Sequence, residues 1–235
     1  MDAATDEPRW GLGEAILGFL LGLVLSSLFA SIWVGGDADK ELSLGGQAFA
    51  SVGLWIGLVG AAVYSARRKG SGSLRKDFGL EVRPVDLPVG AVAGVAAQVV
   101  LVPVVALILR PLLGTPDVSG PVEDLVEGAE GVAVAGLFLL VAVGAPLVEE
   151  LFFRGLVLGA IRRRLGTVGA VVGSSVLFGL AHPQDLPGDA LALLMISLAV
   201  LGGLFAALAV RAGRLGPAIV AHAVFNAWTL VRVFE

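Results

Sequence analysis

The sequence predicts an all-α protein, a polytopic transmembrane helical bundle of about seven to eight helices. The 235 residues are 57% hydrophobic and 15% charged, with a mean hydropathy of +0.91. Soluble domains have only about 45–50% apolar residues. Seven long apolar runs follow one another, and most reach the ~20 residues that cross a ~30 Å hydrocarbon core. The runs lack strict alternation and the chain holds 33 glycines, which favours closely packed helices over barrel strands.

The apolar runs occupy residues 11–34, 44–65, 87–109, 131–161, 167–182, 190–210 and 215–231. The first follows an acidic start without the basic region or cleavage site of a secretory signal, so we expect it to remain in the protein. Residues 66–86 are a polar loop. Residues 131–164 would measure about 51 Å as one helix, so we expect a break or tilt there. Pro146 is the predicted place, because proline removes a helical hydrogen bond.

Basic residues indicate how the chain is threaded. Lysine and arginine gather at 67–83, 162–164 and 211–214. An even number of predicted spans separates these clusters, so they should share one face, which the positive-inside rule makes cytoplasmic. The N-terminus is then inside and the C-terminus outside. Because the chain has no cysteine, thiol nucleophiles and disulfides are excluded, and a net charge of −4 gives no reason to expect a nucleic-acid partner.

Three short stretches place polar groups inside apolar runs. They read "EELFFR" from Glu149, "FGLAH" from Phe178 and "HAVFN" from His222, and they contain both histidines of the chain. Four-residue spacing stacks Phe178 over His182 and puts His222 on one helix face with Asn226. Ionisable groups within a membrane are by default a functional-site hypothesis. A base, a spare acid, an amide and two imidazoles are the groups that hydrolysis uses.

Spacing also separates the two adjacent glutamates. Glu150 and Arg154 lie four residues apart and can pair along one helix face, which would neutralise a charge that lipid penalises. Glu149 points about 100° away from Glu150, so it remains for chemistry. This assignment rests on geometry alone, and the roles of the two glutamates could be exchanged.

The expected depths of these residues in the membrane indicate that the three stretches come close together. With a hairpin turn at 164–166, Glu149 and His182 both lie about 22–24 Å from the turn and should meet at the same level. His222 lies only about 12 Å past Arg214. It therefore needs a tilted helix or an indented cytoplasmic end to join them.

The three stretches resemble the EExxxR, FxxxH and Hxxx(N/D) motifs of the CAAX protease and bacteriocin-processing family of intramembrane endopeptidases, also called the type II CAAX prenyl endopeptidase group. The resemblance covers residues 131–231. It implies peptide-bond hydrolysis within the membrane, with a membrane-embedded or lipidated peptide or protein as substrate. We expect the chain to divide into two N-terminal transmembrane helices with a cytoplasmic loop, 1–86, and a catalytic core similar to this family, 87–235, although residues 1–65 match the family in nothing beyond being two spans.

The resemblance further implies roles for individual residues. Glu149 and His182 would activate a water molecule. His222 and Asn226 would polarise the scissile carbonyl and stabilise its oxyanion. The supporting groups would be Glu150, Arg154 and Phe178.

Metal dependence stays open at this point. Glu149, His182 and His222 could bind a catalytic zinc ion with water as the fourth ligand. However, the HExxH helix is absent and asparagine is a poor zinc ligand. We therefore favour a glutamate-activated water without a cofactor, with zinc as the alternative.

Two other functions use the same polar cluster. An ion-coupled transporter could relay protons through it, although transporters usually show repeated halves and the deep ionisable groups here fall almost entirely after residue 148. A non-catalytic peptide-immunity protein is the other alternative. The Ala-, Gly- and Val-rich composition is typical of a bacterial protein, so we expect a multi-pass protein of a bacterial cell membrane.

Overall fold

The computed structural model describes residues 10–37 and 39–235, and this part of the chain folds as eight continuous helices without strands. The all-α prediction is confirmed. The elements are α1 Leu12–Val34, α2 Leu44–Lys69, α3 Leu74–Phe78, α4 Asp86–Ala96, η1 Ala97–Leu101, α5 Val102–Leu113, α6 Gly120–Val126, α7 Val132–Leu137, η2 Phe138–Gly144, α8 Ala145–Glu150, η3 Leu151–Val157, α9 Leu158–Leu180, α10 Gly188–Ala212 and α11 Gly216–Phe234. The η elements are π-helical turns that continue the neighbouring α-helices.

Six helices in the described part are long and apolar enough to cross a membrane. The longest of them, Val132–Leu180, contains 49 residues and bends at Gly166, where φ is 69° and ψ is −176°. The bend divides it into two arms, so each of the seven predicted apolar runs corresponds to one helical arm. The protein is an integral, multi-pass membrane protein.

The predicted break at Pro146 is wrong. The helix continues through this residue, which lies in the first turn of α8, directly after the π-helical turn η2. A π-helical turn replaces the usual i→i+4 bonds, so the missing proline N–H costs little there. The chain reverses instead at Gly166, because a positive φ is readily adopted by glycine.

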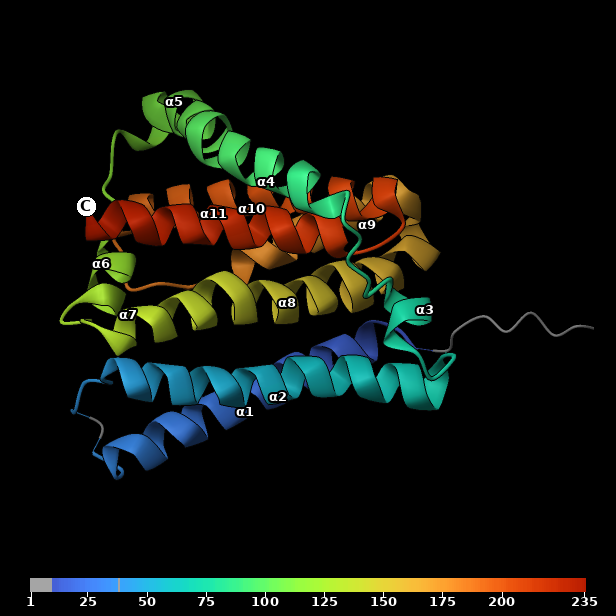
Figure 1. The fold of residues 1–235 in the computed structure, drawn as a ribbon, viewed down its shortest axis with the longest axis horizontal. Coiled ribbons are helices and arrows are strands. Elements are labelled where there is room, and N and C mark those ends of the chain that lie inside the picture. The colour runs from blue at the N-terminus through green and yellow to red at the C-terminus, as the bar shows by residue number, and fades with distance from the viewer. Residues whose placement is uncertain (1–9, 38) are drawn as a thin grey trace, which may run out of the picture.

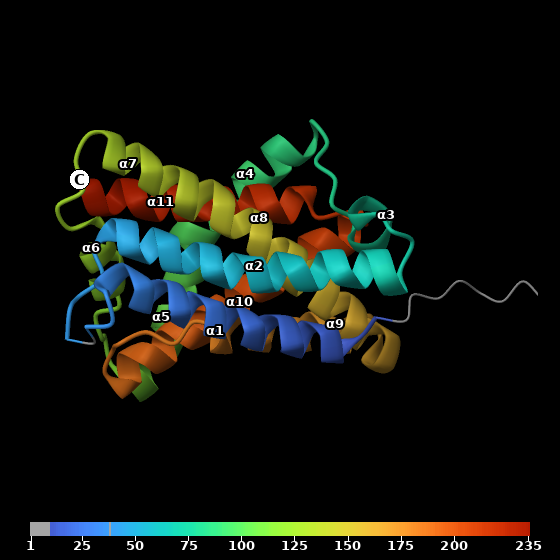
Figure 2. The same ribbon diagram turned by 90° about the horizontal axis from the view of Figure 1, so that it is seen from below.

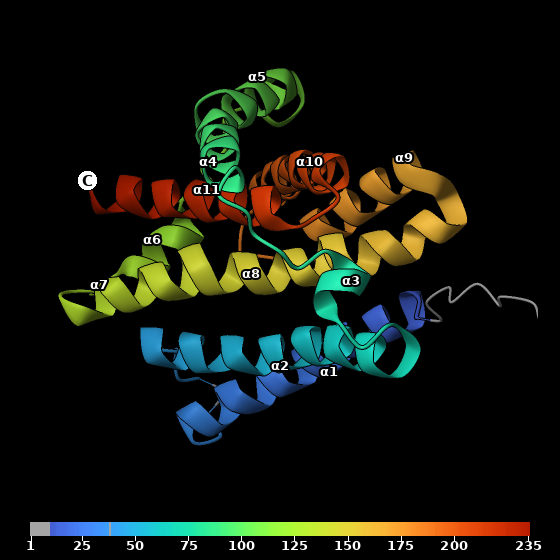
Figure 3. The same ribbon diagram turned by 45° about the vertical axis from the view of Figure 1, so that its right-hand side comes forward.

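The helices are arranged in layers (Figure 1). The long helix from α7 to the first part of α9 lies between the α1–α2 hairpin on one side and α10 and α11 on the other. Figure 2 shows the α1–α2 hairpin from its outer face, and Figure 3 shows α4 and α5 lying across α11 and α10. The polar residues of the three motifs therefore lie on inner helices.

Glycines allow the helices to approach closely. A Cβ atom at Gly94 of α4 would lie 2.5 Å from the backbone oxygen of Ala221 in α11, and one at Gly57 of α2 would lie 2.3 Å from the backbone nitrogen of Gly22 in α1. Small residues at such contacts are typical of helices packed in lipid. The glycine contact of α4 positions α11, which carries His222.

The three basic clusters share one end of the bundle, as predicted. The Arg163 guanidinium lies 4.0 Å from the centroid of the Trp10 ring, near the start of the described chain. The backbone N–H of Leu215 donates to Gly79 just after α3, at 2.8 Å. Arg214 pairs with buried Asp86 through two guanidinium nitrogens. The C-terminus lies at the opposite end (Figure 1).

Gly94→Val should destabilise the protein, because its side chain would meet backbone atoms of α11. We expect a cost of about 1–3 kcal/mol, as for other overpacked sites, and a lower melting temperature in detergent. The matched control is Gly60→Val in α2, where an added Cβ meets nothing within 4 Å. Equal melting temperatures for the two variants would contradict the packing described here.

Candidate active site

Three helices bring the predicted glutamate and histidines together. Glu149 is in α8, His182 follows the end of α9 and His222 is in α11. Glu149 Oε2 lies 3.8 Å from Nε2 of His182 and 3.8 Å from Nε2 of His222. The predicted meeting of Glu149 and His182 at one depth is therefore confirmed.

His222 reaches the same point because α11 begins inside the bundle. Leu215, directly before α11, is only 2% exposed and is bound by the segment after α3. The buried start of α11 agrees with the indented end, which was expected as the alternative to a tilted helix. His222 is itself buried, whereas the side chains of Glu149 and His182 remain 19% and 26% exposed.

The second glutamate forms the predicted ion pair. Glu150 Oε1 lies 3.0 Å from Nη1 of Arg154, and both side chains are completely buried. Nη2 of Arg154 also donates to the backbone oxygen of Gly202 at 3.2 Å. Glu150 is the last residue of α8 and Arg154 lies in η3, so a π-helical turn directly follows the glutamate pair. Such turns are frequent at functional sites.

The ring nitrogens of both histidines have defined partners, from which their protons can be inferred. Nδ1 of His182 lies 2.7 Å from the backbone oxygen of Phe178, which can only accept, so Nδ1 carries a proton. Nδ1 of His222 lies 2.9 Å from Glu150 Oε1 and donates to that carboxylate. Both Nε2 atoms consequently face Glu149.

Aromatic rings surround these polar groups. Phe178 lies 4.7 Å from the His182 ring and 5.8 Å from the His222 ring, and the Arg154 guanidinium lies 4.2 Å from its centroid. Phe205 of α10 stacks on His222 at 4.8 Å with an interplanar angle of 21°. A cation over an aromatic face is attracted by the ring quadrupole, so Phe178 helps to hold Arg154 without a second acid.

Two of these contacts were not predicted. Phe205 and Gly202 lie in the apolar stretch "LGGLF" of α10, where neither spacing nor polarity distinguishes them from other core residues. The i, i+3 relation of Gly202 to Phe205 places both on one face of α10, but this signal occurs throughout the chain.

Asn226 lies on the same face of α11 as His222, as predicted. Its side-chain N–H donates to the backbone oxygen of Val141 in η2 at 2.8 Å. Among the described residues its hydrogen-bond partner is thus this backbone group, and neither Glu149 nor a histidine. Its role towards a substrate stays a prediction.

Glu149, His182 and His222 would hold the metal in the zinc alternative, which stays untested. Among the described residues, no group of three or more His, Asp or Glu side chains is placed to hold a metal ion. Glu149 Oε2 stands 3.8 Å from each histidine nitrogen. Zinc bonds of about 2.0–2.1 Å in a tetrahedral arrangement would bring such donor atoms closer together.

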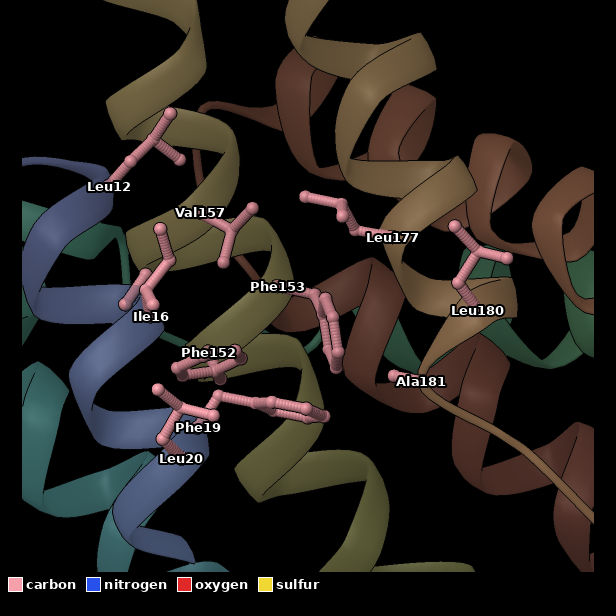
Figure 4. A pocket seen from close by; sticks show the side chains of 11 residues that line it. Leu12, Ile16, Phe19, Leu20, Phe152, Phe153, Val157, Leu177, Leu180 and Ala181 are labelled. Atoms are coloured by element: carbon pink, nitrogen blue, oxygen red, sulfur yellow. The ribbon is translucent and has the colours of Figure 1, made fainter. Parts of the chain in front are cut away.

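A narrow apolar groove of about 220 Å³ lies beside the site, between α1, η3 and the end of α9 (Figure 4). Phe19, Phe152 and Phe153 form part of its wall, and Ala181 next to His182 lies at its edge. Phe153 packs edge-on against Phe178 at 5.2 Å. Aromatic rings thus separate this groove from the two histidines.

The fold and the site define a class: a multi-pass helical membrane protein with a buried cluster of glutamate, arginine and histidine contributed by separate spans. Comparison with known proteins agrees with the resemblance seen in the sequence. Residues 131–228 match the family model described as Type II CAAX prenyl endopeptidase Rce1-like, so this part of the chain is similar to the CAAX protease family. No curated protein and no solved structure matches the chain. This similarity supports an intramembrane CAAX-type endopeptidase that acts on a membrane-associated peptide or protein.

Arg154→Met should lower both stability and activity, because it leaves the carboxylate of Glu150 buried without its counter-charge. Breaking a buried ion pair costs about 3–5 kcal/mol, which thermal unfolding in detergent would detect. The double variant Glu150→Gln, Arg154→Met removes the stranded charge and keeps an acceptor for His222, so it should regain most of the lost stability. A double variant as unstable as Arg154→Met would contradict this account of the pair.

Proposed function

We propose that the protein hydrolyses peptide bonds by a water molecule that Glu149 activates together with His182. The observation that carries this proposal is the position of Glu149 Oε2, 3.8 Å from the Nε2 atoms of both histidines. This separation is too long for a direct hydrogen bond and suits groups that meet through a water molecule. Catalytic hydrogen bonds are also commonly long before the substrate binds.

The proposed reaction has two steps. The water oxygen attacks the scissile carbonyl carbon while Glu149 takes a proton from the water. The lone pair of His182 Nε2 accepts a hydrogen bond from the other water hydrogen and so orients the water. A proton then passes from Glu149 to the amide nitrogen, the C–N bond breaks, and a carboxylic acid and an amine leave. Such proton transfer contributes about 10²–10⁴-fold to rate.

His222 and Asn226 would hold the negative charge that develops on the carbonyl oxygen. His222 has its Nδ1 bound by Glu150 and stacks on Phe205, which fixes Nε2 toward the reacting side. In the proposal Nε2 carries a proton when the oxyanion forms. Asn226 uses one side-chain N–H for Val141, and an amide has a second N–H. Donors aimed at an oxyanion are worth most where water is excluded.

The catalytic unit is proposed to begin before the matched domain, at residue 87. This is supported by the packing of α4 on α11 through Gly94 and by the bond that Gln98 donates to the backbone oxygen of Phe225. The N-terminus is proposed to be cytoplasmic, because the three basic clusters share its end of the bundle. A bacterial cell membrane is the proposed location.

Glu149→Gln, His182→Ala and His222→Ala should each lower peptide cleavage by at least about 10²-fold and leave the protein folded. The measurement is cleavage of a labelled peptide library by the purified protein in liposomes, with thermal unfolding to verify folding. Glu41→Gln makes the same chemical change at an exposed position between α1 and α2 and should cleave at the wild-type rate.

Equal cleavage by the wild-type protein and Glu149→Gln would disprove the catalytic role of Glu149. Loss of activity in Glu150→Gln with full activity in Glu149→Gln would show that the two glutamates have exchanged roles. A wild-type protein that binds peptides without cleaving them would support the peptide-immunity alternative instead.

Metal removal tests the water-activation step separately. Because a water molecule activated by Glu149 needs no metal ion, we expect purified active protein to hold far less than one zinc ion per chain and to keep its rate after dialysis against a chelator. Elemental analysis and cleavage assays on the same preparation measure both quantities. Stoichiometric zinc that is lost together with activity would contradict the proposal.

A further inference from the structure

A second, larger cavity connects the C-terminal end of the bundle with the neighbourhood of the site. It measures about 520 Å³ and lies between α5, α6, α10 and α11. Asp117 and Gln184 line it and are exposed, so the cavity opens at this end. Asn226 and buried Leu201 also line it. Glu149, His182 and His222 do not line the cavity, but its inner lining includes Asn226, one helical turn from His222, and Gln184 lies two residues after His182.

The lining of this cavity suits a mainly apolar chain segment. Most of its lining residues are apolar, for example Val102, Leu125, Leu198 and Phe225. Scattered polar groups could bind a peptide backbone at intervals, namely Gln98, Ser119, Gln184, Ser197 and Thr229. Its volume lies within the roughly 300–1,000 Å³ of common ligand cavities. The groove of Figure 4, in contrast, is lined by apolar side chains throughout.

The segments at the mouth of the cavity are strongly acidic. Residues 114–131 hold five carboxylates and 181–187 hold one, and neither segment has a lysine or arginine. The neighbouring Arg110 and Asp189 cancel in charge. The Ser119 backbone N–H and hydroxyl donate to Asp117 and hold the pKa of its carboxyl below its usual value, so it stays ionised. A mouth of one charge sign attracts segments of the opposite sign.

We infer that the substrate enters through this cavity from the acidic end. Its apolar residues occupy the cavity beside the scissile bond, and lysine or arginine residues flank them at the mouth. This inference rests on the proposed function, because it specifies which peptides reach Glu149 and His222. The acidic end is the one opposite the three basic clusters, so the proposed topology places substrate entry on the non-cytoplasmic side.

Matched peptides test the charge preference. The full-length protein in liposomes is given peptides with one apolar core and with lysine, glutamine or glutamate at the flank. At low salt we expect kcat/KM for the lysine peptide to exceed that for the glutamate peptide by about 10-fold or more, since steering raises association by 10–10³. The ratio should fall at high salt, because the Debye length is only about 3 Å at 1 M.

Two triple variants show which acidic residues cause the charge preference. Asp117→Asn, Glu123→Gln, Asp124→Asn removes charges at the mouth and should reduce the lysine-to-glutamate ratio at least threefold. Asp37→Asn, Asp39→Asn, Glu41→Gln removes as many charges from the α1–α2 loop at the same end and should leave the ratio unchanged. An equal fall in both would mean that the overall charge of this end acts, and would overturn entry at the mouth.

Two tryptophan substitutions in α10 test the cavity itself. Ser197→Trp would fill it, whereas Ile196→Trp points to the lipid-facing groove between α9 and α10. With equal melting temperatures, Ser197→Trp should lower kcat/KM at least 10-fold and Ile196→Trp should not. Equal activity of the two variants would overturn the inference.

A binding experiment distinguishes a failure of this inference from a failure of the proposed function. Glu149→Gln is titrated with the fluorescently labelled lysine and glutamate peptides. Preferential binding of the lysine peptide without any wild-type cleavage would overturn the catalytic proposal and support the inferred entry. Equal binding, or binding of neither peptide, would overturn the inferred entry even if the wild-type protein cleaves other substrates.

Discussion

The ion pair between Glu150 and Arg154 is the interaction on which the site depends. Two adjacent carboxylates in an apolar helix would be costly, since an unpaired charge at this depth is penalised by several kcal/mol. Arg154 neutralises one of them at 3.0 Å and is held in turn by Gly202 and the face of Phe178. The paired carboxylate then orients His222 through Nδ1. Because Glu150 is occupied in this way, Glu149 remains beside both imidazoles.

The backbone brings this pair to its partners. The bend at Gly166 folds α9 back so that His182 lies beside Glu149, and the inward start of α11 at Leu215 carries His222 to the same depth. Glycine contacts between α4 and α11 allow the close packing that fixes α11. The result is a polar cluster whose glutamate and two histidines are far apart in the sequence and come from different helices.

Much of the fold could be predicted because it follows from local pattern: apolar run length, the basic clusters and the four-residue spacing of Glu150 and Arg154. The depth argument succeeded because an antiparallel hairpin fixes the relative height of its arms. The prediction of a break at Pro146 was wrong, because the π-helical turn before it accommodates the proline. The contacts of Phe205 and the Glu150–His222 hydrogen bond depend on how α10 and α11 are rotated against α8, which the sequence alone does not encode in any local signal.

The most direct test is an experimental structure with a bound peptide in which a phosphinic group replaces the scissile amide, because transition-state analogues occupy the reacting position. The account predicts one phosphinic oxygen within about 2.6–3.2 Å of Glu149 and His182, the other oxygen against His222 and Asn226, and Glu150 still paired with Arg154. A phosphinic group bound away from Glu149, or contacted by Glu150 in its place, would contradict the account.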